Sequence, residues 1–217
     1  MMVNVCFHGL GVCEREREPG EARYWMKEDV FLGVLDAVAG RADVALSFDD
    51  GNRSDAEIAL PALRERGLTA TFFVLAGRLD DPASLDAADL RALRAEGMSI
   101  GSHGWSHIPW RGLTSADAKR EFIDARSALE GASGAKISEA AFPLGRYDRS
   151  ALRRLKAAGY RTVFTSDRFP ARKSSWLQAR YSVTADDTVE SVSRIARGRP
   201  GLHEARNVLA SAVKRVR

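Results

Sequence analysis

The chain has 217 residues, 45% of them hydrophobic and 29% charged, with a formal net charge of +4 at pH 7. This length and composition predict a single domain over residues 1–217 with one large core. The basic residues are dispersed and form no basic-aromatic platform, which argues against a nucleic-acid partner. No run approaches the roughly 20 apolar residues of a bilayer span, which excludes integral membrane association.

Short apolar runs alternate with helical segments along the chain. The runs predict strands at about 3–7, 44–48, 70–75, 98–101, 139–142, 161–165 and 179–183. The segments between them predict helices at about 58–66, 86–96, 114–130 and 148–159. Ser54-Asp55-Ala56-Glu57 has the form of a capping box ahead of the first, and Asp148 is predicted to cap the last. This alternation predicts an α/β fold, a deformed (β/α) barrel with about seven parallel strands. A doubly wound open sheet is the alternative.

Two polar motifs lie at the ends of predicted strands. Ser47-Phe48-Asp49-Asp50-Gly51 ends one strand, and Ser102-His103-Gly104-Trp105-Ser106-His107 follows another. Proteins of the α/β class build their sites at the carboxyl ends of strands. One carboxylate and two imidazoles hold a divalent cation at three positions, and the second carboxylate is then free to act as a base. Either motif alone is also typical of a turn or a polar loop, but the two together favour metal binding.

These motifs resemble the first two signatures of the NodB-type polysaccharide deacetylases, carbohydrate esterase family 4, and the resemblance extends over about residues 3–183. It implies a deformed (β/α) barrel and metal-dependent removal of acetyl groups from amino sugars. By position, the resemblance assigns Asp49 as the catalytic base and Asp50, His103 and His107 as metal ligands. The expected metal is Zn²⁺, with Co²⁺ or Ni²⁺ as alternatives.

The third family signature, Arg-x-Pro-Tyr/Phe-Gly, reads Ala141-Phe142-Pro143-Leu144-Gly145 here, so alanine stands in place of the arginine. Pro143 is kept and is expected at the substrate site, and the amide of Leu144 is expected to donate to the oxyanion. For the missing arginine we predict Arg180, because the last predicted strand opens at the same barrel mouth. A bidentate contact would hold Asp49 ionised and oriented. A surface arginine is the alternative.

The histidine-containing acid motif expected near the C-terminus does not follow the last predicted strand. Instead, the first strand, Val3-Asn4-Val5-Cys6-Phe7, ends in His8-Gly9. This order is similar to the circularly permuted branch of the family, which includes enzymes acting on poly-N-acetylglucosamine. The resemblance implies that His8 is the general acid that protonates the leaving amine. A structural histidine at a strand end is the alternative.

Three connecting segments are expected to lie over the site. The segment at 14–24, rich in Glu and Arg, is interpreted mainly as a solvated excursion. Trp110 follows the histidine motif and is predicted to contact substrate by stacking, with core packing as the alternative. Trp176 lies in a faint match to the fourth family signature and is predicted to form a wall of the acetyl pocket.

The C-terminal segment predicts an amphipathic helix at about 204–216. Its apolar stripe is expected to pack on the barrel, with a membrane-surface helix as the alternative. No secretory signal peptide is recognised, and two cysteines do not suggest a disulfide scaffold. We therefore expect a cytoplasmic protein.

These expectations predict a metal-dependent deacetylase that hydrolyses the acetamide of an N-acetylated amino sugar to acetate and a free amine. The expected partner is a carbohydrate substrate. One alternative is a hydrolase of another non-peptide amide, such as a cyclic imide or ureide. The other is a non-catalytic sugar-binding relative, for which the arginine missing from the third motif is the sequence argument.

Overall fold

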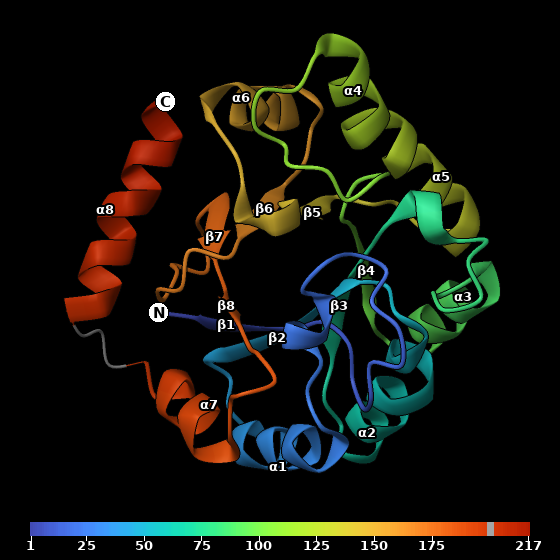
Figure 1. Ribbon diagram of the computed structural model, residues 1–217, viewed down its shortest axis with the longest axis vertical. Coiled ribbons are helices and arrows are strands. Elements are labelled where there is room, and N and C mark those ends of the chain that lie inside the picture. The colour runs from blue at the N-terminus through green and yellow to red at the C-terminus, as the bar shows by residue number, and fades with distance from the viewer. Residues whose placement is uncertain (199–201) are drawn as a thin grey trace.

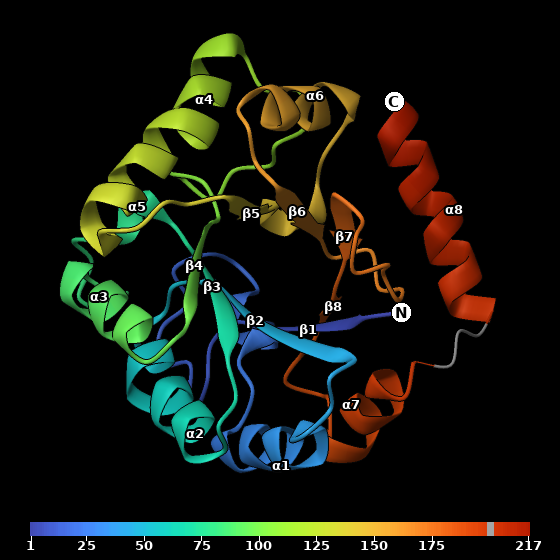
Figure 2. The same cartoon turned by 180° about the vertical axis from the view of Figure 1, so that it is seen from behind.

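The computed structural model describes residues 1–198 and 202–217. Its strands form one parallel sheet in the order β7-β6-β5-β4-β3-β2-β1-β8. Their bounds are β1 Val3–Phe7, β2 Val44–Asp50, β3 Ala70–Val74, β4 Ser99–Ser102, β5 Glu139–Ala141, β6 Thr162–Thr165, β7 Leu177–Ala179 and β8 Tyr181–Ser182. Figures 1 and 2 show these strands at the centre of a ring of helices. The predicted deformed (β/α) barrel is confirmed.

One chain segment forms both edges of this sheet. β7 pairs with β6 and β8 pairs with β1, and only Arg180 separates β7 from β8. Across the same seam, Asn4 Nδ2 donates to the carbonyl of Ala179 at 3.0 Å. The interrupted last strand therefore nearly closes the barrel and places Arg180 in its wall. The sequence predicts this segment as one strand, because a one-residue interruption leaves the apolar pattern almost unchanged.

Helices surround the sheet on its outer side (Figure 1). Their bounds are α1 Glu28–Val38, α2 Leu60–Glu65, α3 Ala87–Ala95, α4 Ser115–Lys119, α5 Ala125–Ser133, α6 Arg149–Ala157, α7 Val189–Ala196 and α8 Leu202–Val216. Two π-helical turns, η2 Asp55–Ala59 and η4 Arg120–Asp124, lead into α2 and α5. Short 3₁₀ turns are η1 Glu21–Tyr24, η3 Ala76–Arg78 and η5 Pro143–Gly145.

Capping side chains set the starts of several helices. Asp86, Thr114 and Asp148 each accept a hydrogen bond from a backbone N–H in the first turn of α3, α4 and α6, as their sequences predict. The capping box predicted at Ser54 is wrong. Its hydroxyl instead accepts from the backbone N–H of Leu10 at 3.1 Å, so it joins the loop after β1 to the loop after β2.

Aromatic side chains pack between the sheet and α1, while polar side chains face the barrel interior. Phe7, Phe48 and Phe72 stack across neighbouring strands with ring centroids 5.2 and 4.7 Å apart. Phe31 of α1 meets the first two edge-on at 5.2 and 5.9 Å. Because consecutive strand residues point to opposite faces, the residues between these aromatics project inward. The apolar layer thus holds the fold, and the interior combines polar groups such as Asp49 and Arg180 with the rings of Phe73 and Phe164.

The C-terminal helix α8 packs with its polar side toward the barrel, so the expected packing of its apolar stripe is wrong. Asn207, Ser211 and Lys214 face the barrel, and each hydrogen-bonds a group there. The stripe faces solvent, with exposed fractions of 47% for Val208, 70% for Leu209, 57% for Val213 and 74% for Val216. Polar groups of the barrel that need partners decide this orientation. Over the described ranges, no helix combines the length and apolarity needed to cross a bilayer.

Candidate functional site

A cavity of about 630 Å³ lies at the carboxyl ends of the strands. Parallel strands end at the same rim of a barrel, so side chains from distant parts of the chain meet there. The sequence-predicted residues that line the cavity are His8 after β1, Asp49 and Asp50 at the end of β2, His103 and His107 after β4, and Leu144 after β5.

Asp50, His103 and His107 form a cluster whose potential ligand atoms lie within 4.8 Å of one another. Asp50 Oδ1 is 3.5 Å from Nε2 of His103 and 3.3 Å from Nε2 of His107. This oxygen is buried and has no hydrogen-bond partner in the part of the chain that the structure describes. A buried carboxylate oxygen without a partner is costly unless a cation meets it. Two imidazoles and one carboxylate therefore fit a divalent cation such as Zn²⁺.

The Nδ1 atom of each imidazole contacts an acceptor. His103 Nδ1 lies 3.0 Å from the carbonyl of Ala141, and His107 Nδ1 lies 2.6 Å from Oε2 of Glu18. Such contacts favour the proton on Nδ1 and leave the lone pair on Nε2, the atom that faces Asp50. Burial lowers the pKa of His103 to about 4 against the opposing effect of the nearby carboxylates. This ring is therefore neutral at neutral pH, as a metal ligand must be.

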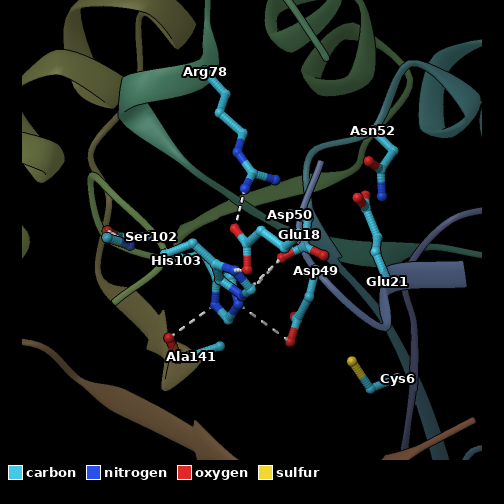
Figure 3. A network of polar contacts seen from close by, with 12 residues as sticks. Cys6, Glu18, Glu21, Asp49, Asp50, Asn52, Arg78, Ser102, His103 and Ala141 are labelled. Carbon is cyan, nitrogen blue, oxygen red and sulfur yellow. Dashed lines mark hydrogen bonds and ion pairs between the residues drawn. The ribbon is translucent and has the colours of Figure 1, made fainter. Parts of the chain in front are cut away.

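Glu18 belongs to the segment at 14–24, which lies over the cavity as expected. The interpretation as a solvated excursion fits its exposed residues but not Arg17, Glu18 and Glu21. Figure 3 shows the carboxylate of Glu18 bound by the guanidinium of Arg78, which comes from η3. Further along the segment, Arg17 pairs with Glu21 at 2.8 Å, and the ring of Tyr24 lies 4.8 Å from that of His8. Arg17, Glu18 and Glu21 therefore hold this segment against the cavity, while other charged residues of the segment are exposed.

Asp49 and Arg180 form a buried ion pair. Arg180 Nη1 donates to Oδ1 of Asp49 at 2.6 Å, and Nη2 donates to Oδ2 at 2.7 Å. Burial by itself would raise the pKa of Asp49, but Arg180 and His103 outweigh it and hold that pKa below its usual value. Asp49 is therefore ionised at neutral pH. The predicted contact is present, and its part in a reaction stays a prediction.

His8 and Leu144 border the cavity from different strands. Nδ1 of His8 is buried and has no hydrogen-bond partner within the described ranges. Leu144 has a left-handed backbone with φ of 55°, and its side chain is 52% exposed. Both residues thus lie at the cavity, and their proposed roles as acid and oxyanion donor stay predictions.

Glu121, a residue that the sequence analysis missed, holds the loop between the two histidines. Its buried carboxylate accepts from the backbone N–H of Trp105 at 2.8 Å, that of Ser106 at 3.1 Å, and Nε1 of Trp110 at 3.2 Å. Gly104 has φ of 90°, and any Cβ there would collide with this carboxylate. Glu121 lies in the π-helical turn η4, a feature frequent at functional sites. A glutamate within a predicted helix carries no sequence signal that separates it from a surface residue.

The prediction that Trp110 contacts substrate is wrong. Its side chain is 0% exposed and packs edge-on against Phe122 and Phe142 at centroid distances of 4.8 and 5.3 Å. From sequence, a tryptophan that packs in the core beneath a site cannot be distinguished from one that faces the site. Only its packing separates the two cases.

Trp176 and Pro143 are also not substrate contacts in this structure. Trp176 directly precedes β7 at the amino end of the barrel, opposite the cavity, and its Nε1 donates to the carbonyl of Tyr160 at 2.8 Å. Pro143 is buried beneath the cavity wall that its neighbours Phe142 and Leu144 form. Parallel strands separate their two ends by the height of the barrel, which explains why a residue before a strand does not reach the site.

A second group of potential ligand atoms, from Cys6, His8 and Asp49, also lies within 4.8 Å. Both oxygens of Asp49 are already bonded to Arg180. Burial raises the pKa of the Cys6 thiol far above its usual value. With its only carboxylate bonded to Arg180, this group is a weaker candidate for a cation than the cluster of Asp50, His103 and His107.

A family model described as polysaccharide deacetylase matches residues 37–163. The match includes both polar motifs and excludes the segments that contain His8 and Arg180. YxkH of Bacillus subtilis (strain 168), assigned to the polysaccharide deacetylases, is 25% identical over 157 residues, which are 72% of this chain. The chain spans 56% of the length of that relative.

Solved structures of similar fold include the Streptococcus pyogenes deacetylase PplD in complex with acetate. It aligns with a TM-score of 0.80 at 18% identity over 92% of this chain and 98% of its own. IcaB from Ammonifex degensii aligns with a TM-score of 0.73 at 21% identity over 90% and 97%. At these identities the likeness shows a shared fold. With the family model matching more than half of the chain across both motifs of the cavity, this protein belongs to the NodB-type polysaccharide deacetylases, carbohydrate esterase family 4.

Proposed function

We propose that this protein is a metal-dependent deacetylase that hydrolyses the acetamide of an N-acetylated amino sugar to acetate and a free amine. One observation carries the proposal: the ionised Asp49 lies beside the cluster of Asp50, His103 and His107, with its Oδ2 3.8 Å from Nε2 of His103. A base next to a candidate cation site is the arrangement that hydrolysis of an unactivated amide requires. Family membership supports an acetylated saccharide over other amides.

Asp50, His103 and His107 are the residues that would hold the divalent cation, Zn²⁺ by its donor set. When bound, the cation supplies Lewis-acid polarisation of the acetamide carbonyl. Asp49 accepts a proton from the attacking water as general base. Each oxygen of Asp49 bonds to Arg180 through one lone pair and keeps another for this proton.

Two further residues complete the proton and charge balance. The backbone N–H of Leu144 donates to the oxyanion of the tetrahedral intermediate. His8 protonates the nitrogen as the C–N bond breaks, so the sugar leaves as a neutral amine. The partnerless Nδ1 of His8 and the left-handed backbone of Leu144 at the cavity support these assignments.

The contact between Arg180 and Asp49 disfavours a role limited to sugar binding. The sequence argument for that role is the arginine missing from the third motif. Arg180 makes the contact with Asp49 that the missing arginine would make. Orienting a base is a requirement of catalysis and not of binding.

The test is acetate release from a panel of N-acetylated sugars, sugar nucleotides and chitin oligomers. Metal-stripped protein should be inactive, and Zn²⁺, Co²⁺ or Ni²⁺ should restore release. Asp49→Asn should bind the metal and lose turnover by about 10²–10⁴-fold. Asp80→Asn, the same change at an exposed position, should match the wild type.

Two results would contradict the proposal in different ways. Near-normal turnover by metal-loaded Asp49→Asn would overturn the assignment of the base. If metal-loaded protein released no acetate from any acetylated sugar, the proposed deacetylase activity would be wrong. Cyclic imides and ureides would then be the next substrates to test.

A further inference from the structure

Four non-glycine residues in the described part of the chain have a positive φ: Asp50 at 76°, His107 at 56°, Leu144 at 55° and Arg168 at 57°. All four line the same cavity. Left-handed backbone is strained for residues with a side chain, and such strain clusters at functional sites. Three of the four already have proposed roles as metal ligands or oxyanion donor. Arg168, which follows β6, has none.

The surrounding structure holds Arg168 in this conformation from several directions. Its backbone N–H donates to the carbonyl of Arg180 at 3.0 Å, and its own carbonyl accepts from Asn207 Nδ2 of α8 at 3.0 Å. Its guanidinium donates to the carbonyl of Ser182 and lies 5.7 Å from the centroid of the Tyr181 ring. These contacts hold the cationic side chain at a defined position in the cavity wall.

The polar side of α8 supports both the segment around Arg168 and the segment around Leu144, whose amide is the proposed oxyanion donor. Lys214 pairs with Asp167 at 2.6 Å and donates to the carbonyl of Gly145 at 3.2 Å. Ser211 lies 3.1 Å from the hydroxyl of Tyr147, which donates to the same Asp167 at 2.6 Å. One helix thus braces the two cavity segments that follow β5 and β6, which explains why its polar side packs inward.

Apart from Asp50, which belongs to the candidate cation site, the carboxylates that line the cavity already have partners within the described residues. Glu18 pairs with Arg78, Glu21 with Arg17 and Asp49 with Arg180, while Asp187 accepts from Thr184 and Ser191. By contrast, Arg168, Arg146 and Arg23 line the cavity and form no ion pair with a carboxylate of the described residues. Beside the candidate cation site, the cavity wall therefore carries three arginines that are not in an ion pair with any described carboxylate.

We propose that Arg168, with Arg146 and Arg23, binds an anionic group of the substrate, so the acetylated sugar carries a carboxylate or a phosphate near its acetamide. The planar guanidinium matches both anions through paired hydrogen bonds. A neutral polymer of N-acetylglucosamine offers no such group. This inference rests on the proposed deacetylation and names the class of its substrate.

The test compares kcat/KM for acetate release from three sugars of similar size. One is a neutral N-acetylglucosamine disaccharide, one carries a carboxylate and one carries a phosphate monoester. The wild type should prefer one of the charged sugars, and the two charged arms identify the anion. Hydrogen bonds to charged groups correspond to about 10–100-fold, so Arg168→Gln should lower the ratio of charged to neutral kcat/KM by about that factor.

Two further variants keep the result interpretable. Arg172→Gln makes the same change at an exposed position on the same segment, outside the cavity lining, and should retain the wild-type preference. Arg146→Gln probes the anion site from the segment after β5 and should reduce the preference even if Arg168→Gln folds poorly. A wild type that does not distinguish the three sugars, or an Arg168→Gln ratio equal to wild type, would overturn the proposal.

Failure of deacetylation and failure of anion recognition give different results. If no sugar releases acetate, calorimetric binding of the same three sugars to Asp49→Asn decides the question without turnover. Tighter binding of a charged sugar that disappears when Arg168→Gln is added supports the anion site. Equal binding of all three sugars refutes it.

Discussion

Arg180 closes a bidentate ion pair with Asp49 across 131 positions of sequence, with N–O distances of 2.6 and 2.7 Å. Both side chains are almost fully buried, at 1% and 3% exposed. The guanidinium also lies 5.0 Å from the ring centroid of Phe73 and 5.8 Å from that of Phe164, inside the barrel. The pair therefore links the last strand to β2, and it sets the charge state of the proposed base.

Removing either Arg180 or Asp49 alone should lower the stability of the fold. In Arg180→Met, Asp49 loses its cation while it stays buried, and the free energy of unfolding should fall by about 3–5 kcal/mol. Urea unfolding of metal-stripped protein measures this loss for Arg180→Met, Asp49→Asn and the double variant. The double variant should lose less than the sum of the two single losses. Simple additivity would show that the two residues are not coupled.

Glu18 should determine metal affinity through His107. Its carboxylate accepts from Nδ1 of His107 at 2.6 Å and keeps the lone pair on the ligand atom. Glu18→Ala should weaken metal binding by about 10–100-fold, measured by competition with a chelator. Glu14→Ala, an exposed position on the same segment, is the matched control and should bind as the wild type does. Equal affinities for the two variants would remove Glu18 from the site.

Asp55 should make stability fall as the pH rises. Burial, together with the charge of Asp50, raises the pKa of Asp55 well above its usual value, and neither carboxyl oxygen has a hydrogen-bond partner within the described ranges. The folded state therefore keeps a proton that the unfolded chain releases above about pH 4. Unfolding free energy should drop by up to about 1.4 kcal/mol per pH unit from there to the folded-state pKa.

Asp55→Asn removes this titration. In metal-stripped protein the variant should match the wild type near pH 4 and exceed its stability at pH 7, as thermal unfolding across that range would show. Asp80→Asn at an exposed position controls for the change of net charge. A wild-type stability that rises between these two pH values relative to Asp55→Asn would reverse the sign and contradict the burial argument.

Glu121 should stabilise the loop between His103 and His107. Glu121→Ala leaves three N–H donors without their acceptor, at about 1–3 kcal/mol for each one that stays buried. For a chain of this size each kcal/mol corresponds to about 2–4 °C in Tm. Glu121→Gln keeps one acceptor oxygen, so its Tm should lie between those of the wild type and Glu121→Ala. Glu57→Ala, at an exposed position on η2, is the control and should leave Tm unchanged. If Glu121→Ala had the same Tm as this control, water would be replacing the carboxylate as the acceptor.

Sequence alone was sufficient for features that depend on neighbouring residues. Apolar runs of four to six residues predicted most of the strands, and Asp86, Thr114 and Asp148 predicted helix starts, because periodicity and capping are local properties of the backbone. The Asp49-Asp50 and His103–His107 motifs were recognised for the same reason. Each follows a strand, and a parallel barrel brings all strand ends to one rim.

Only the tertiary structure decided which distant groups meet. Glu18 reaches His107 across 89 positions, Trp110 turns into the core, and α8 presents its polar side to the barrel. No local pattern separates a carboxylate in solvent from one that orients an imidazole, or a stacking tryptophan from a buried one. These outcomes depend on which polar groups remain without partners after the barrel closes, and that is a property of the whole fold.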